Sequence, residues 1–366
     1  MGNSHRVGIV GLGNISAVYL ETLSQSRTVS ITAVADLDEA RAKAVAEQIP
    51  GARALTVEDL VTSSEVDTVL NLTIPSAHAQ IALAAIRAGK HTYGEKPLAA
   101  SMSDARAIVE AGIAAGVRVG CAPDTVLGTG VQTARAFVDS GGIGRPLAAS
   151  ATMVAPGHER WHPNPDFFYL PGGGPLLDMG PYYVSALVQL LGPVRSVVGA
   201  SSRLRAERVI NNGGRAGEAI PVKVQTHISG VLEHENGALS TLTTSFDGAA
   251  TNAANIEVHG ELGTLALPDP NWFDGEVRFI ETGGTEWRAL DVAAGYQEGA
   301  RGAGLLDFIE ATPERPARAS GTLALHVLEI MTALLQSAEQ GQRIALATTA
   351  ERGPAVPLTA RSEWLK

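Results

Sequence analysis

The stretch RVGIVGLGNIS, residues 6–16, decides the fold of this chain. Its apolar, β-branched beginning predicts a strand, followed by a glycine turn and then a helix. Gly11 and Gly13 take the first two positions of a G-x-G-x-x-G pattern, and Ser16, another small residue, takes the third. Glycines at these positions let backbone N–H groups at a helix N-terminus approach a pyrophosphate. The stretch therefore predicts the start of a dinucleotide-binding domain, with Gly11, Gly13, Asn14 and Ile15 at the cofactor.

Strand-like and helix-like segments alternate from residue 6 to residue 120. Strands separated by helices of this length need crossover connections and a parallel sheet covered on both faces. Residues 1–123 are therefore predicted to form a doubly wound α/β domain of the Rossmann type. The predicted strands are Arg6–Val10, Val29–Ala35, Thr68–Thr73, His91–Tyr93 and Val117–Gly120, and the predicted helices are Ile15–Leu23, Leu37–Ile49, Ala77–Ala88 and Ser101–Ala115.

The pattern changes after Pro123, where strands follow one another without helices between them. This arrangement favours a mostly antiparallel sheet in a second, α+β domain of residues 124–366. An Asn-Asn-Gly-Gly stretch indicates that Glu207–Glu218 is a flexible loop. The predicted strands are Ala148–Val154, Val194–Ser201, Val222–His234, Ala238–Phe246, Ile256–Val258 and Glu276–Ile280, and the predicted helices are Val131–Ser140, Gly304–Ala311 and Leu323–Gln340.

The composition excludes several classes of partner. The formal net charge is −10 and no run of Lys or Arg occurs, so nucleic acid and anionic membranes are poor partners. No apolar run reaches the roughly 18 residues of a membrane helix, and no signal segment precedes Arg6. The single cysteine, Cys121, could be a nucleophile, but it ends an apolar run and is better read as a buried thiol. A lone thiol fits a reducing compartment, and a cytoplasmic location is expected.

An acidic residue stands where a dinucleotide site needs one. Asp36 lies 23 residues after Gly13, at the end of a predicted strand. A carboxylate there can accept hydrogen bonds from both ribose hydroxyls and would repel a 2′-phosphate. Leu37 and Asp38 follow it without an arginine, which favours NAD over NADP. Asp36 could also be the N-cap of the helix that follows.

Two further stretches follow predicted strands of the first domain. The sequence TIPSAH, residues 73–78, lies at the carboxyl end of a strand, where ligands gather in open α/β sheets. It supplies Thr73, Pro75 and His78 as cofactor candidates, although His78 could equally be a first-turn helix residue without a ligand. In HTYGEKPL, residues 91–98, a proline stops regular pairing, so Lys96 sits on a tight turn that can aim its ammonium at a ligand.

The stretch GGGPLLDMGPYY, residues 172–183, places two chemical groups on one helical face. Asp178 and Tyr182 are four residues apart, a spacing that makes them neighbours on a helix. A phenol with its ordinary pKa of about 10 is a poor base at neutral pH, but a nearby ammonium would lower that pKa. The alternative reading makes Asp178 a helix cap and Tyr182 a core aromatic.

One motif points to a chemistry that its surroundings forbid. HERWH, residues 158–162, matches the H-E-x-x-H pattern of zinc metalloproteases. That chemistry needs a stable helix, yet Pro156-Gly157 precedes the motif and Pro163 follows it. No metal is expected. The segment is predicted to be a loop in which Trp161 and His162 wall a substrate pocket.

Taken in order, these stretches resemble the Gfo/Idh/MocA oxidoreductases over essentially the whole chain. The resemblance rests on GLGNI (11–15), IPSAH (74–78) running into AGKH (88–91), EKP (95–97) and the GGG…DMG segment (172–180). It implies a Rossmann domain followed by a domain with a large open sheet, which often builds dimers or tetramers. By the same resemblance, Lys96 reaches substrate and nicotinamide, Glu95 belongs to the cofactor site, and Asp178 positions a substrate hydroxyl.

The chain departs from many members of the family at residue 182. Those members, inositol dehydrogenases among them, have histidine four residues after the aspartate, where this chain has Tyr182. The branches similar to glucose–fructose oxidoreductase and dimeric dihydrodiol dehydrogenase have tyrosine there as the proton donor or acceptor. The resemblance therefore assigns acid–base chemistry to Tyr182 and leaves the substrate open.

The resulting hypothesis is an NAD(P)-dependent oxidoreductase of a secondary alcohol or carbonyl in a sugar, polyol or related compound. Lys96, Asp178 and Tyr182 are its catalytic residues, and the same three with Trp161 and His162 contact substrate. Expected partners are a small polyhydroxy molecule and further copies of the chain in a homodimer or homotetramer. Two alternatives remain: a cofactor-binding regulator without turnover, and a glycoside hydrolase that uses transient oxidation.

Overall fold

The computed structural model describes residues 4–366, which form two compact units. Unit 1 contains the chain up to Thr129 together with Ala294–Leu325 and Gly353–Lys366, and unit 2 contains Gly130–Ala293 and His326–Arg352. The sequence placed one boundary at residue 123 and assigned everything after it to the second domain. Two C-terminal segments belong instead to unit 1, because they pack on it: Lys366 O accepts a hydrogen bond from Thr28 N at 3.1 Å.

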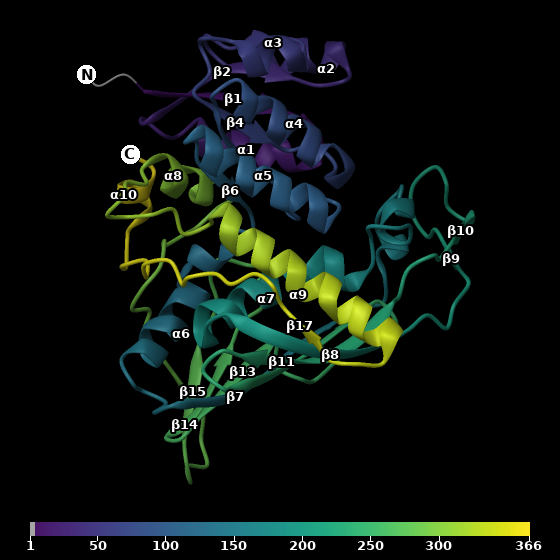
Figure 1. Ribbon diagram of the computed structural model, residues 1–366, viewed down its shortest axis with the longest axis vertical. Helices are drawn as coiled ribbons and strands as arrows, with labels where there is room; N and C mark the ends of the chain where they lie inside the picture. The colour runs from purple at the N-terminus through teal and green to yellow at the C-terminus, as the bar shows by residue number, and fades with distance from the viewer. Residues whose placement is uncertain (1–3) are drawn as a thin grey trace. The chain divides into compact units, whose positions relative to one another are not determined.

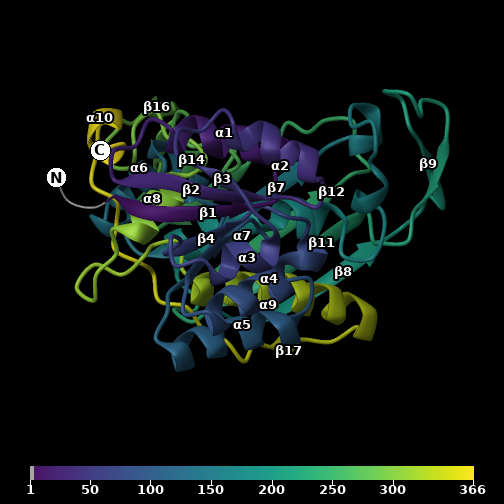
Figure 2. The ribbon, with the colours of Figure 1, turned by 90° about the horizontal axis from the view of Figure 1, so that it is seen from above.

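Unit 1 is built on a six-stranded sheet in the order β3-β2-β1-β4-β5-β6, with every neighbouring pair parallel. This arrangement confirms the doubly wound fold. Figure 2 shows α1 on one side of the sheet and α4 and α5 on the other. The strands are β1 (His5–Val10), β2 (Val29–Ala35), β3 (Arg53–Ala54), β4 (Thr68–Asn71), β5 (His91–Gly94) and β6 (Val119–Cys121), and the helices are α1 (Asn14–Leu23), α2 (Glu39–Ala46), α3 (Val57–Thr62), α4 (Pro75–Arg87), α5 (Met102–Ala115), α8 (Ala303–Ile309) and α10 (Arg361–Trp364).

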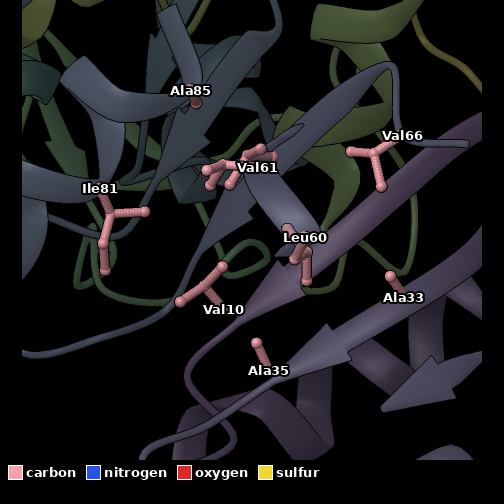
Figure 3. Packing of buried hydrophobic residues seen from close by; sticks show 9 residues of the cluster. Val10, Ala33, Ala35, Leu60, Val61, Val66, Ile81 and Ala85 are labelled. Atoms are coloured by element: carbon pink, nitrogen blue, oxygen red, sulfur yellow. The ribbon is translucent and has the colours of Figure 1, made fainter. Parts of the chain in front are cut away.

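Small residues on the sheet let helices pack closely in this unit. Ala33 and Ala35 of β2 and Val10 of β1 form a buried cluster with Leu60 of α3 and with side chains of α4 (Figure 3). A Cβ added at Gly8 would lie 2.8 Å from Leu60 Cδ2, so a side chain there would push α3 away from the sheet. This packing positions the carboxyl ends of β1, β2 and β4, which carry the predicted cofactor residues.

Unit 2 contains a nine-stranded sheet in the order β16-β15-β14-β13-β7-β12-β11-β8-β17. Only β7 and β12 pair in parallel among the neighbours in this sheet, which confirms a mostly antiparallel fold. The strands are β7 (Pro146–Val154), β8 (Val194–Ser202), β11 (His227–His234), β12 (Leu239–Ser245), β13 (Ile256–Gly260), β14 (Gly263–Leu267), β15 (Arg278–Glu281), β16 (Arg288–Ala289) and β17 (Ile344–Ala345), and the helices are α6 (Thr129–Asp139), α7 (Pro175–Leu191) and α9 (Gly321–Gln340). The first turn of α9, up to Leu325, is counted with unit 1.

Helix α9 runs along this sheet (Figure 1). Glycines make room for it, since a Cβ at Gly230 would lie 2.4 Å from Leu334 Cδ2 and one at Gly199 would lie 2.7 Å from Leu334 O. By length and composition α9 could also cross a membrane, although its sequence is interrupted by His326 and Glu329. Because 61% of the qualifying window is buried inside the protein, α9 fits the description of a core helix.

Two predictions for the region after residue 200 were wrong in part. The flexible loop predicted over Glu207–Glu218 is shorter than expected: residues 210–218 lie outside regular structure, but Glu207–Val209 forms β9, which pairs with β10 (Ala219–Pro221) in an antiparallel hairpin (Figure 1). The strand predicted over Val222–His234 begins only at His227. Tertiary contacts of Arg208 order the hairpin, and this side chain is only 3% exposed. The sequence alone does not indicate this, because arginine is usually a surface residue.

Candidate active site

The glycine turn after β1 has the geometry of a phosphate-binding turn. Gly11 has φ +93°, and a Cβ there would lie 2.8 Å from the backbone of Leu72 and Thr73 at the end of β4. Gly13 is the N-cap of α1, and a Cβ added there would meet nothing within 4 Å. The first N–H groups of a helix have no intrahelical acceptor and carry partial positive charge. The open space at Gly13, beside exposed Asn14, therefore fits a dinucleotide pyrophosphate.

Asp36 occupies the predicted position at the end of β2. Its Oδ2 accepts a hydrogen bond from Leu12 N at 2.7 Å, and its Oδ1 accepts one from Asp38 N at 2.9 Å. The N-cap of α2 is Asp38, whose Oδ1 accepts from Arg41 N, so the cap alternative for Asp36 is wrong. The sequence reading also missed Arg41, whose Nη1 lies 3.3 Å from Asp36 Oδ1. This edge of the sheet thus presents a carboxylate and a guanidinium together.

The segment after β4 is held in place by His78. The ring is 2% exposed, with Nδ1 2.7 Å from Pro97 O and Nε2 2.9 Å from Thr73 O. Thr73 in turn donates its hydroxyl to Asn71 Oδ1 at 2.7 Å, and Pro75 stands in the first turn of α4. Both nitrogens of His78 thus lie beside backbone carbonyls, which ties the end of β4 to the Lys96–Pro97 turn.

Lys96 follows β5 on a turn whose backbone is fixed by Glu95. The Glu95 side chain is buried, its Oε2 accepts from Lys96 N at 3.1 Å, and its Oε1 accepts from Tyr19 Oη at 2.7 Å. Tyr19 belongs to α1, the helix that begins at the glycine turn. Glu95, predicted at the cofactor, thus joins this helix to the backbone of Lys96, a link that the sequence did not reveal.

Removing the Tyr19 hydroxyl should loosen this link. We expect Tyr19→Phe to lower the free energy of unfolding by about 1–3 kcal/mol, because a buried carboxylate loses a donor, and to lower turnover as Lys96 becomes mobile. Tyr296→Phe is the matched control, since Tyr296 Oη donates to Asp307 at 3.0 Å in another buried pair of unit 1. Steady-state kinetics, measured together with chemical unfolding, should show loss of activity in Tyr19→Phe only. Equal activity in Tyr19→Phe and Tyr296→Phe would contradict the proposed link between Tyr19 and Lys96.

Unit 2 carries Asp178 and Tyr182 on α7, as the spacing predicts. Asp178 lies in the first turn of this helix, where the helix dipole favours a carboxylate. The N-cap of α7 is Gly174, at φ +94°, so Asp178 is not a cap. Tyr182 is 6% exposed on the next turn of the same face. The helix therefore presents a carboxylate and a phenol side by side.

His158 is a candidate site residue that the sequence did not indicate. Its Nε2 lies 2.8 Å from Asp178 Oδ2, and both side chains are mostly buried. Trp161 Nε1 lies 3.3 Å from His158 Nδ1 and donates to it. This contact assigns the ring proton to Nε2, where it is donated to Asp178. Asp178 lies 20 residues after His158, so no spacing rule pairs the two side chains, and the sequence offers only the general expectation that a buried carboxylate needs hydrogen-bond donors.

The remainder of HERWH forms an aromatic cluster. The segment is a 3-10 turn at His158–Arg160 and not an α-helix, as its flanking prolines predict. Trp161 is 56% exposed and packs edge-on against both His158 and His162. Burial, helped by the His158 ring, lowers the pKa of His162. Within residues 4–366 no group of three His, Cys, Asp or Glu side chains could hold a metal ion.

Cys121 is buried, as the sequence predicts. Burial raises the pKa of its thiol and so disfavours the nucleophilic thiolate, which confirms Cys121 as a structural residue.

A cavity of about 440 Å³ lies at the N-terminal end of α7, lined by Gly172–Gly174, Leu176, Lys223, Gln225 and neighbouring residues. Its lining includes neither Asp178 nor Tyr182, so the cavity is separate from their face of the helix.

A parallel sheet with a glycine turn after its first strand and a carboxylate after its second defines a nucleotide-binding domain of an NAD(P)-dependent dehydrogenase. Comparison with known sequences agrees. Residues 5–122 match the oxidoreductase family with an NAD-binding Rossmann fold, and residues 131–266 match the C-terminal domain of the same family. The chain belongs to the Gfo/Idh/MocA oxidoreductase family, and it is an NAD(P)-dependent dehydrogenase acting on CH–OH groups.

Individual relatives give the degree of similarity. Inositol 2-dehydrogenase 3 of Saccharopolyspora erythraea is 40% identical over 149 residues, which cover 39% of this chain and 43% of that protein. The 1,5-anhydro-D-fructose reductase of Ensifer adhaerens is 31% identical over 71% of this chain and 75% of that protein. A crystal structure of an NAD binding oxidoreductase from Klebsiella pneumoniae has a TM-score of 0.82 at 21% identity, over 94% of this chain and all of that one, which shows a shared fold.

Proposed function

We propose that the protein interconverts a secondary alcohol and a ketone on a sugar or polyol, with NAD as the preferred cofactor. The observation that carries the proposal is the Asp178–His158 pair with Tyr182 one turn further along α7. A carboxylate held by an imidazole can orient a substrate hydroxyl, and a phenol can exchange its proton. The named relatives act on an inositol and on an anhydro-sugar, which supports polyhydroxy substrates here.

Each residue has a proposed task. Bound NAD supplies a hydride acceptor at nicotinamide C4. As the alcohol C–H bond breaks, Tyr182 receives the hydroxyl proton, directly or through solvent. Lys96 polarises the substrate oxygen and favours the phenolate of Tyr182. Asp178, held by His158, accepts a hydrogen bond from a substrate hydroxyl and fixes which carbon reacts.

The preference for NAD rests on Asp36. Its carboxylate is fixed by two backbone N–H groups at the end of β2, where ribose hydroxyls would be bound and a 2′-phosphate repelled. Arg41 is paired with both Asp36 and Asp38, so its charge is offset by two carboxylates. The net negative charge of this group favours the cofactor without the additional phosphate.

The test is the appearance of reduced nicotinamide absorbance with NAD and with NADP, over a panel of inositols, sugars and sugar acids. Signal with one substrate class, and with NAD in preference to NADP, is the expected result. Cofactor binding without turnover on any substrate would instead support a regulatory protein. Release of a sugar from a glycoside without net NADH accumulation would support the hydrolase alternative.

We also propose that the protein forms a homodimer or homotetramer through the sheet of unit 2. Val198 and Val231 are neighbours across β8 and β11, and they are 41% and 37% exposed. The same row continues through Thr241 and Ser150, giving a flat strip of small side chains suited to packing against a second copy.

A charge in this strip should prevent association. We expect Val231→Glu to be a monomer by light scattering at concentrations where the unaltered chain is an oligomer. The control is Val292→Glu, which changes a valine that is 48% exposed and outside the sheet. An unaltered chain that is monomeric at all concentrations would refute the proposal.

A cytoplasmic location is proposed on the strength of the lone free thiol of Cys121. Cell fractionation tests it, and recovery of the protein outside the cytoplasm would refute it.

A further inference from the structure

The β9–β10 hairpin holds a buried ion-pair network that leads to the candidate site. Arg208, on β9, is 3% exposed. Its Nη1 lies 3.0 Å from Glu159 Oε1 and 3.2 Å from Pro156 O, and its Nη2 lies 2.5 Å from Asp247 Oδ1 and 3.0 Å from Phe246 O. Both guanidinium branches are therefore used, which a lysine could not reproduce.

Glu159, the second residue of HERWH, is the buried anchor of this network. It is 5% exposed, and besides Arg208 it accepts a hydrogen bond from Tyr169 Oη. Its own carbonyl accepts from Asn211 N in the hairpin at 2.8 Å. A Cβ added at Gly157, where φ is +101°, would lie 2.3 Å from the Glu159 carboxylate, so the turn leaves no room for a larger residue.

The network contacts His158 from two sides. Tyr169 Oη, bound to Glu159, accepts a hydrogen bond from His158 N at 3.1 Å. Phe246, whose carbonyl binds Arg208, packs against the His158 ring with centroids 4.6 Å apart. His158 in turn lies 2.8 Å from Asp178. The backbone and the ring face of His158 are thus both set by groups that Arg208 organises.

We propose that Arg208 is a positioning residue for the reaction, acting through Glu159 to hold His158 against Asp178. The inference rests on the proposed role of Asp178 in orienting substrate. This role gives the β9–β10 hairpin a function. Without Arg208, the buried carboxylate of Glu159 would lose its cationic partner, and the Pro156–Tyr169 segment would lose its anchor.

The first test is kinetic, with Arg208→Lys and the milder Glu159→Gln. We expect kcat/KM for the substrate to fall about tenfold or more in each, because loss of orientation of a reacting group has effects of that order or larger. Cofactor affinity, followed by NADH fluorescence, should be unchanged, because the predicted cofactor residues belong to unit 1. The matched control is Arg135→Lys, another buried arginine of unit 2, which binds Gln189 and Asp139. It should lower stability without changing kcat/KM.

The second test does not depend on turnover. Nitrogen-15 spectra of the histidine rings, with His158 assigned by difference from His158→Gln, should show a single tautomer with the proton on Nε2. Arg208→Lys and Glu159→Gln should give mixed tautomers, and Arg135→Lys should not.

The outcomes separate the two levels of the proposal. The unaltered protein could show no turnover with any substrate while Arg208→Lys still changes the His158 tautomer as expected. That result would contradict the proposed function and support the positioning role of Arg208. Normal kcat/KM and an unchanged His158 tautomer in both Arg208→Lys and Glu159→Gln would overturn the inference.

Discussion

Tyr182→Phe should lower turnover by about 10²–10⁴-fold, the range expected for losing a positioned proton-transfer group. Tyr182 is 6% exposed on α7, and phenylalanine fills the same space without the hydroxyl. Because the predicted cofactor residues lie in unit 1, NAD affinity should stay within about twofold of the original value. Single-turnover measurements with saturating NAD would isolate the chemical step.

The adjacent residue supplies the control for this variant. Tyr183 follows on the same helix, is 1% exposed, and has its hydroxyl bound to Asp269 and Asn255. Tyr183→Phe should lower stability yet keep turnover, because its hydroxyl points to structural partners. If Tyr182→Phe retained full turnover, the alternative reading of Tyr182 as a core aromatic would be correct.

Gly11→Ala should disrupt the nucleotide-binding turn. The new Cβ would lie 2.8 Å from the backbone of Leu72 and Thr73, at a φ of +93° that disfavours any side chain. We expect the free energy of unfolding to fall by about 1–3 kcal/mol and NAD binding to fall below detection in a fluorescence titration.

Gly13→Ala, two residues away, is the matched comparison. Its φ is −76° and the added methyl meets no protein atom within 4 Å, so stability should change by less than about 0.5 kcal/mol. NAD affinity should nevertheless fall, since the methyl enters the space left for the pyrophosphate. Equal affinity for NAD in Gly13→Ala and the original chain would contradict the assignment of this turn to the cofactor.

Most of the fold was predictable because its signals are local. The strand over Val29–Ala35 was predicted to the residue, and the helix ending at Ala115 differs by one residue at its start. Apolar periodicity and capping residues such as Ser101, whose Oγ accepts from Asp104 N, mark these elements without tertiary information. The short helix Val57–Thr62 was not predicted, because six residues carry too little periodicity to detect.

The candidate site was predictable only in part, for a related reason. Asp178 and Tyr182 lie four residues apart on one helix, so their proximity follows from helical geometry. His158 could not be placed from spacing, because it reaches Asp178 through a turn and not along a helix. Tyr19 and Glu95 are 76 residues apart in the chain, and no local pattern relates them.

The sequence by itself determined the class of the protein: the glycine turn, the acid after the second strand and the order of the motifs specify a two-unit dehydrogenase of this family. The tertiary structure alone decided which side chains support those motifs. In the folded protein, Asp178 is paired with His158, and the turn that carries Lys96 is held by Glu95, whose carboxylate binds Tyr19. Arg208 anchors the β9–β10 hairpin by its ion pair with Glu159. The physical reason is that backbone geometry is set by neighbours in the chain, whereas a buried charge takes its partner from whichever segment the fold brings beside it.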